Sequence, residues 1–221
     1  SGRVTKYAAL ALRARAALYF GNYAEAEKSA KAVMDSGKYS LFKLTSLSAA
    51  QEQEAKEMDL YIDFESLGID KDKFIKGMFS YESLWQGTNA TPANPEYVLT
   101  HEYMEDPYAY DDSRYTYFLP LSMSIHHGYS SFEPMQDLVD AYWNIDGKTI
   151  PDKIPVETRK ANYEKIWNFA KGLSAEEYKA FATSPDLMTY DYMKEFKNRD
   201  SRLYVTLLFP FKGWHETAAG E

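Results

Sequence analysis

The sequence contains no cysteine and no long apolar run, and each absence excludes a class of structure. Without cysteine the chain forms no disulfide scaffold, no thiol nucleophile and no zinc site with thiolate ligands. No run approaches the roughly 18 apolar residues that a membrane-spanning helix needs. Basic residues number 25 against 33 acidic ones and form no stripe, so nucleic acid is not an expected partner.

Aromatic residues are plentiful instead, at 16% of 221 residues, and 19 of them are tyrosine. An excess of tyrosine can fill a core or form a surface that stacks on a ligand, and for most of them the core interpretation is favoured. Trp143 and Trp167 lie on helical stripes, so we predict that both belong to the core.

Residues 3–36 predict an antiparallel hairpin of two helices. Gly21 and Asn22 interrupt the helical pattern, as expected for two residues that tolerate a left-handed backbone. Each helix carries small residues at helical spacing, which lets two backbones approach closely. The predicted facing stripes are Tyr7, Ala11, Ala14 and Leu18 in the first helix and Tyr23, Ala26, Ala30 and Val33 in the second.

Further helices are expected after the hairpin, together with a few short strands. Ser48 is a predicted N-cap, and Ser174 with Glu177 forms a predicted capping box. The expected helices cover residues 46–59, 133–143, 156–173, 175–183 and a segment ending near 196. Apolar, β-prone runs predict strands over 96–103 and 202–209, and residues 60–64 fit either a strand or a helical turn.

Four blocks of sequence, taken in order, resemble one known family. They are residues 2–39 with the hairpin, Asn94-Pro95-Glu96-Tyr97-Val98-Leu99, the helix segment Pro134 to Tyr142 with Leu-Val-Asp-Ala-Tyr, and Asn198-Arg199-Asp200-Ser201-Arg202-Leu203. Together they resemble the SusD/RagB family of Bacteroidetes, and the turn at residues 21–26 also resembles that of a tetratricopeptide repeat. Ser201 stands where the family usually has Pro, and residues 44–76 match no pattern that we recognise.

The resemblance implies a mainly α fold, with tetratricopeptide-like helical hairpins packed with an irregular, loop-rich region and a few short strands. We expect residues 1–221 to form a single SusD-like domain that is the middle portion of a longer protein. Within it, the hairpin would occupy residues 1–40 and a loop-rich ligand-binding region residues 78–221.

The same resemblance implies a function without catalysis and without a cofactor. The protein would be a cell-surface glycan-binding subunit that captures oligo- or polysaccharide and delivers it to a SusC-like, TonB-dependent outer-membrane transporter. A lipid anchor outside this sequence would attach it to the outer membrane. The alternative is a helical-repeat scaffold that binds only protein partners.

The loop over residues 104–129 is the expected ligand site, because a long irregular segment inside a compact domain is more often functional than idle. Glycan capture needs aromatic faces for sugar rings and polar side chains for hydroxyls. The candidates are Trp85, Tyr108, Tyr110, Tyr115 and Tyr117 for stacking, and Asp111, Asp112 and His126 for hydrogen bonds. The competing interpretation is that most of these tyrosines pack the loop onto the core.

Two sharper chemistries are disfavoured in this region. A glycosidase needs two carboxylates roughly 5 to 10 Å apart, and the acidic residues here (Glu102, Glu105, Asp106, Asp111 and Asp112) are too common in the chain to indicate one. The pair His126-His127 lacks further spaced ligands, so no metal site is predicted.

Overall fold

The computed structural model describes residues 4–85, 94–100 and 134–213. The chain divides into two compact units. We call Ser1–Phe42 with Ser83–Glu133 the hairpin unit, and Lys43–Glu82 with Pro134–Glu221 the core unit. That residues 1–221 form a single domain, divided into regions 1–40 and 78–221, stays a prediction.

The described residues are mainly helical, which confirms the expected fold class. Within them the only strand-like pairing is one antiparallel bridge between Asn144 and Arg199. None of the described helices is long and apolar enough to cross a membrane.

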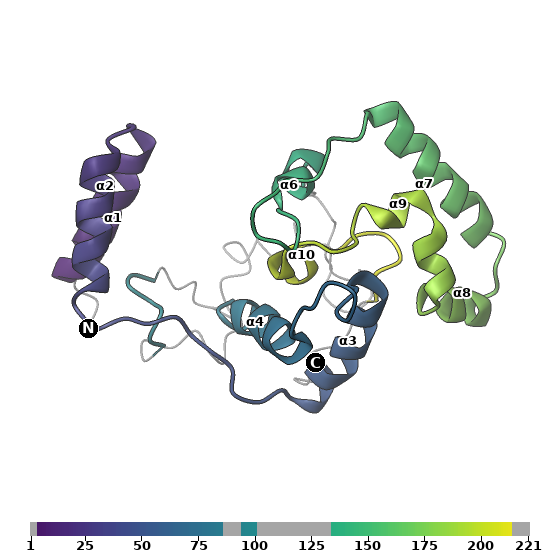
Figure 1. The fold of residues 1–221 in the computed structure, drawn as a ribbon, viewed down its shortest axis with the longest axis horizontal. Coiled ribbons are helices and arrows are strands. Elements are labelled where there is room, and N and C mark those ends of the chain that lie inside the picture. Colours follow the sequence, from purple (N-terminus) through teal and green to yellow (C-terminus); the bar gives the residue numbers. More distant parts are fainter. Residues whose placement is uncertain (1–3, 86–93, 101–133, 214–221) are drawn as a thin grey trace, which may run out of the picture. The chain divides into compact units, whose positions relative to one another are not determined.

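The hairpin unit contains the predicted pair of helices, α1 (Lys6–Tyr19) and α2 (Tyr23–Met34), which Figure 1 shows side by side. The Thr5 hydroxyl accepts a hydrogen bond from the Ala8 N–H at 3.1 Å, and the Asn22 side chain accepts one from the Glu25 N–H at 3.2 Å. Both helices therefore begin at a side-chain cap. Gly21 adopts the expected left-handed backbone, with φ +70°, whereas Asn22 has φ −86°.

The contact between α1 and α2 differs from the predicted stripes. The buried residues are Ala8 and Ala17 in α1 and Ser29 and Val33 in α2, whereas Leu18, Tyr23 and Ala30 are exposed. The hydrophobic pattern missed Ser29, whose hydroxyl donates to the Glu25 carboxylate at 2.7 Å and so tolerates burial. The predicted stripes were thus wrong at these three positions, although the hairpin is confirmed.

The core unit consists of short helices joined by turns. They are α3 (Ala49–Tyr61), α4 (Lys71–Ser83), α6 (Gln136–Ala141), α7 (Val156–Ala170), α8 (Ala175–Ala182), the 3₁₀ helix η1 (Pro185–Thr189), α9 (Asp191–Lys194) and α10 (Ser201–Thr206). Ser48 caps α3, as predicted, and Gln51 completes a capping box there. The predicted capping box of Ser174 with Glu177 begins α8. The sequence did not predict α4.

Large aromatic side chains fill the centre of the core unit. Phe196 and Phe209 stack with ring centroids 4.0 Å apart, and Tyr61 packs on Phe209 at 5.6 Å and on Tyr204 at 5.7 Å. Burial raises the pKa of Tyr61 and of Tyr204 well above the ordinary value, because a phenolate would lose its hydration there. Part of the aromatic excess is therefore structural.

The two tryptophans assigned to the core are not buried. Trp143 is 42% exposed and Trp167 is 47% exposed. Trp167 lies parallel to Tyr163 on α7, with ring centroids 6.4 Å apart. Trp167 lies in a helix as predicted, but Ile166 and Ala170 are the residues of α7 that face the core, and Trp143 lies beyond the end of α6.

The strand predictions are wrong wherever the structure describes them. Residues 202–209 begin with α10, where the Asp200 side chain accepts from the Arg202 N–H at 2.9 Å as an N-cap. Leu203, Tyr204 and Leu207 are buried at helical spacing, which an unbroken apolar run conceals. Residues 60–61 end α3, which agrees with the helical alternative given for 60–64, and residues 96–100 form turns. Residues 101–103 lie outside the described part.

Candidate functional site

Only one predicted site residue belongs to the part of the chain that the structure describes. Trp85 follows α4, and its side chain is 75% exposed, as stacking on a ligand would require. The other candidates lie outside the described residues: Tyr108, Tyr110, Asp111, Asp112, Tyr115, Tyr117 and His126. The tyrosine-rich loop therefore stays a prediction.

The Asn94-Pro95-Glu96 block binds the segment that leaves the hairpin. The Glu96 carboxylate accepts a hydrogen bond from the Phe42 N–H at 2.7 Å, and the Pro95 carbonyl accepts one from the Ser40 N–H at 3.0 Å. The Tyr97 hydroxyl donates to the carbonyl of Leu84, the residue before Trp85. This block thus joins the segment that leaves the hairpin to the backbone next to Trp85 within the hairpin unit.

Residues 198–202, which we call the signature segment, organise the core unit. Asn198 has φ +54°, a left-handed conformation that Asn tolerates better than most residues. Its N–H donates to the Tyr61 carbonyl at 2.8 Å, and its side-chain oxygen accepts from the Asp63 N–H at 2.9 Å. Asn198 therefore fixes the segment against the end of α3.

Arg199 is only 3% exposed and binds backbone carbonyls rather than a ligand. Its guanidinium donates to the carbonyls of Val139 at 2.8 Å and Tyr142 at 2.7 Å, and to that of Glu195 at 2.6 Å. Carbonyls at the end of a helix have no partner within that helix, so Arg199 satisfies the end of α6. Two of the recognised blocks, around 134–142 and 198–204, therefore contact each other.

Asp200 and Arg202 form a forked ion pair at the beginning of α10. Arg202 donates from Nε to one carboxylate oxygen at 3.0 Å and from Nη2 to the other at 2.6 Å. Burial acts to raise the pKa of Asp200, but the hydrogen bonds and charge of Arg202 outweigh it and lower that pKa. The pair is therefore ionised and held in one geometry.

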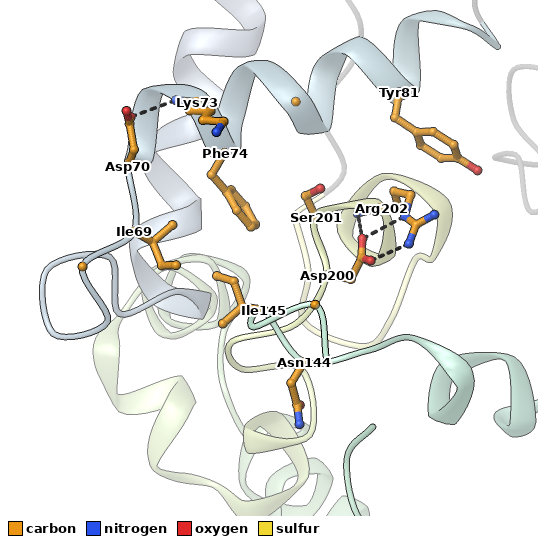
Figure 2. A pocket seen from close by; sticks show the side chains of 13 residues that line it. Ile69, Asp70, Lys73, Phe74, Tyr81, Asn144, Ile145, Asp200, Ser201 and Arg202 are labelled. Carbon is orange, nitrogen blue, oxygen red and sulfur yellow. Dashed lines mark hydrogen bonds and ion pairs between the residues drawn. The ribbon is translucent and has the colours of Figure 1, made fainter. Parts of the chain in front are cut away.

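A cavity of about 590 Å³ lies between α4 and the signature segment, in the core unit. One face of α4 and the turn before it form the first wall, and the other comes from residues 144–147 and 200–202. Figure 2 shows Phe74 and Tyr81 extending from α4 on the side that faces Ser201 and Arg202. The lining residues are Gly68, Ile69, Asp70, Lys73, Phe74, Gly77, Tyr81, Asn144, Ile145, Gly147, Asp200, Ser201 and Arg202.

The lining combines aromatic, aliphatic and hydrogen-bonding groups, as small-molecule sites do. None of these residues was a candidate from the sequence. The signature segment was recognised as a block of sequence, but its place opposite α4 depends on the fold. Gly77 in the middle of α4 was a local signal for this site, but the sequence did not predict α4 itself.

The comparisons with known proteins give one match. The model of the SusD family matches residues 95–221, which is more than half of the chain. No curated protein and no solved structure matches. The matched range includes the signature segment and α6, whereas α4, which forms the opposite wall of the cavity, precedes it.

Proposed function

The chain belongs to the SusD family, and we therefore propose that it is a non-catalytic, cell-surface glycan-binding subunit. Family membership indicates a glycan-binding role in nutrient uptake. The finer proposal is that the protein captures oligo- or polysaccharide at the outer membrane, to which a lipid anchor attaches it, and delivers the glycan to a TonB-dependent transporter. The match over residues 95–221 is the observation that carries the proposal.

Glycan capture is proposed at the loop over residues 104–129 together with Trp85. The exposed indole of Trp85 supports this assignment, because an aromatic face must be open to solvent before a sugar ring can stack on it. The tyrosines, aspartates and histidine of the loop supply the residue types that sugar hydroxyls and ring faces require.

Transporter docking is proposed at the hairpin, which leaves large apolar side chains in solvent. Exposed apolar surface that collects on one element is typical of a protein interaction site. The exposed side chains are Leu12 (51%), Leu18 (58%), Tyr19 (79%), Phe20 (87%), Tyr23 (71%) and Met34 (74%). Four of them lie at or near the turn between α1 and α2, at positions 18–20 and 23.

The test of glycan capture is affinity electrophoresis of the whole chain through gels that contain single polysaccharides. We expect at least one polysaccharide to retard the wild type, and Trp85→Ala and Tyr115→Ala to reduce that retardation. Trp167→Ala is the matched control, since it removes another exposed tryptophan side chain, from α7. Unretarded wild-type protein in every gel would contradict glycan capture, and unchanged binding by both loop variants would contradict the loop assignment.

The alternative function is a helical scaffold that binds only proteins, and the exposed hairpin side chains also favour it. Co-purification with a TonB-dependent transporter separates the two functions when it is combined with the glycan gels. Transporter binding that depends on Phe20 and Tyr23, with no response to any glycan, would establish the scaffold function instead.

A further inference from the structure

Gly77 occupies the middle of α4 without a packing reason. Glycine is less favourable than alanine inside a helix, because it loses more backbone entropy on folding. A methyl group built at Gly77 would meet no other atom within 4 Å. The backbone there is therefore bare on the side of the cavity, although the fold leaves room for a side chain.

The opposite wall carries a guanidinium, that of Arg202, which is held in place and still has a hydrogen-bond donor left for a ligand. The Asp200–Arg202 fork leaves the Nη1 group of Arg202 with no hydrogen bond among the described residues. The Asn144 side chain, by contrast, points away from α4 in Figure 2, and its amide donates to the Thr149 hydroxyl at 3.0 Å, so it offers the cavity no polar group. A fixed donor such as the Arg202 guanidinium binds a hydroxylated ligand at a low entropic cost.

Aromatic and aliphatic side chains complete the lining. The Phe74 ring is held edge-on by Phe64, with centroids 5.4 Å apart, and lies 6.4 Å from Tyr204. Ile69 and Ile145 are partly buried beside it. In Figure 2 the Phe74 side chain extends from α4 toward Ile145 and Ser201. The cavity thus has an apolar end that would accept the C–H face of a sugar ring.

The charges of the lining balance. Asp70 and Asp200 oppose Lys73 and Arg202, and Asp200 already neutralises Arg202 through two hydrogen bonds. A polyanionic or polycationic ligand would gain little net attraction from such a set. The balance favours an uncharged ligand that hydrogen-bonds through hydroxyl groups.

We propose that this cavity is a binding subsite for a neutral sugar residue, separate from the predicted tyrosine-rich loop. The sugar lies along the bare backbone at Gly77, makes apolar contact with Phe74, and hydrogen-bonds to Arg202. This subsite rests on the proposed function of glycan capture, and it places part of the recognition on α4, which precedes the residues matched by the family model.

Gly77→Ala is the main test, because it separates binding from folding. The thermal midpoint should stay the same or rise, since the methyl group meets no atom and alanine favours the helix. Affinity for a neutral polysaccharide should fall at least ten-fold, and Gly77→Leu, which fills more of the cavity, should abolish binding at this subsite.

The matched control is Gly172→Ala. Gly172 follows α7, has no left-handed φ, and does not line this cavity. The affinity of this variant should equal that of the wild type. The probes are the neutral polysaccharides amylopectin, laminarin and galactomannan, with polygalacturonate and heparin as acidic counterparts. Calorimetric titration and affinity electrophoresis each measure the binding of every probe to the full chain.

Four outcomes decide the proposal. Loss of neutral-glycan binding in Gly77→Ala but not in Gly172→Ala supports the subsite. Equal binding by Gly77→Ala, Gly77→Leu and wild type overturns the subsite while glycan capture stands. Preferential binding of an acidic probe that Lys73→Ala removes overturns the assignment to neutral sugars. If the wild type binds no probe, glycan capture itself fails and the subsite with it.

Discussion

The hairpin unit and the core unit use their apolar residues in opposite ways. The core unit buries large side chains almost completely, among them Tyr204, Phe79 and Leu203. The hairpin unit buries only small or medium side chains between α1 and α2, and Tyr19 and Phe20 remain in solvent. Internal packing therefore stabilises mainly the core unit, whereas the hairpin unit exposes apolar surface of the kind that binds a partner.

A pair of leucine-to-alanine variants tests this contrast with the largest expected effect. Leu203 is fully buried, and Leu203→Ala should lower the free energy of unfolding by about 2–5 kcal/mol, since it removes packed atoms and leaves a cavity. Leu18 is 58% exposed, and Leu18→Ala should change stability by less than about 0.5 kcal/mol. Urea denaturation measures both, and similar losses would contradict the contrast.

The buried guanidinium of Arg199 should matter almost as much as the apolar core. Arg199→Gln should cost on the order of 3 kcal/mol, because carbonyls at the end of α6 and that of Glu195 lose a charged donor. Arg202→Gln, an exposed position in the same segment, is the control and should cost far less. Hydrogen exchange should show α6 opening first in the Arg199 variant, and protection equal to the wild type would refute this role.

The acid stability of the core unit should depend on Asp200. Its pKa is lowered in the folded state, so its stabilising effect is complete above the ordinary value of about 4 and is lost as pH falls through the lower folded value. Asp200→Asn cannot titrate, and its urea midpoint should therefore fall less steeply than that of the wild type below about pH 4.

Glu25 offers the comparison in the hairpin unit. Its pKa is lowered by the hydrogen bond from Ser29 and also by the charge of Arg13, 2.8 Å away. Glu25 is paired with Arg13 through a single contact, whereas Arg202 donates two hydrogen bonds to Asp200. Glu25→Gln should therefore change the acid dependence less than Asp200→Asn, and added salt should weaken its effect further. A larger effect at Glu25 would reverse the expected order of the two units.

The smallest expected effect is a gain in stability at Ser201. This residue is the first of α10, and no described residue accepts a hydrogen bond from its N–H. Proline is well suited to that position, and Asp200 before it has the extended backbone, φ −51° and ψ 135°, that a following proline requires. Ser201→Pro should raise stability by about 0.4–1 kcal/mol, and a fall in the thermal midpoint would show that α10 does not begin as described.

The signals that predicted structure correctly were local. Ser48 and the pair Ser174 with Glu177 cap helices as expected, since each acts on backbone groups within three residues. Long apolar runs misled the prediction instead. Residues 202–209 suit either a strand or a buried helix turn by composition, and the cap at Asp200 together with burial of Leu203 and Tyr204 selects the helix.

The two candidate sites, the loop and the cavity, also differ in whether local sequence indicates them. Trp85 and the loop over residues 104–129 could be proposed from composition alone, because aromatic and acidic residues collect in one stretch of chain. The cavity could not be proposed, since Gly77 and Arg202 lie far apart in the sequence and become neighbours only when α4 packs opposite the signature segment. Periodicity shows which residues share one helix face but not which surface that face meets.

The sequence by itself determined the helical hairpin and its turn, and it identified the blocks that place the chain in its family. The tertiary structure decided that Arg199 is buried against backbone carbonyls, that Trp143 and Trp167 stay exposed, and that a cavity lies beside α4. The physical reason is how far apart in the sequence the interacting groups lie. Caps and turns depend on groups a few residues apart, whereas burial and cavities depend on how distant segments of the chain pack.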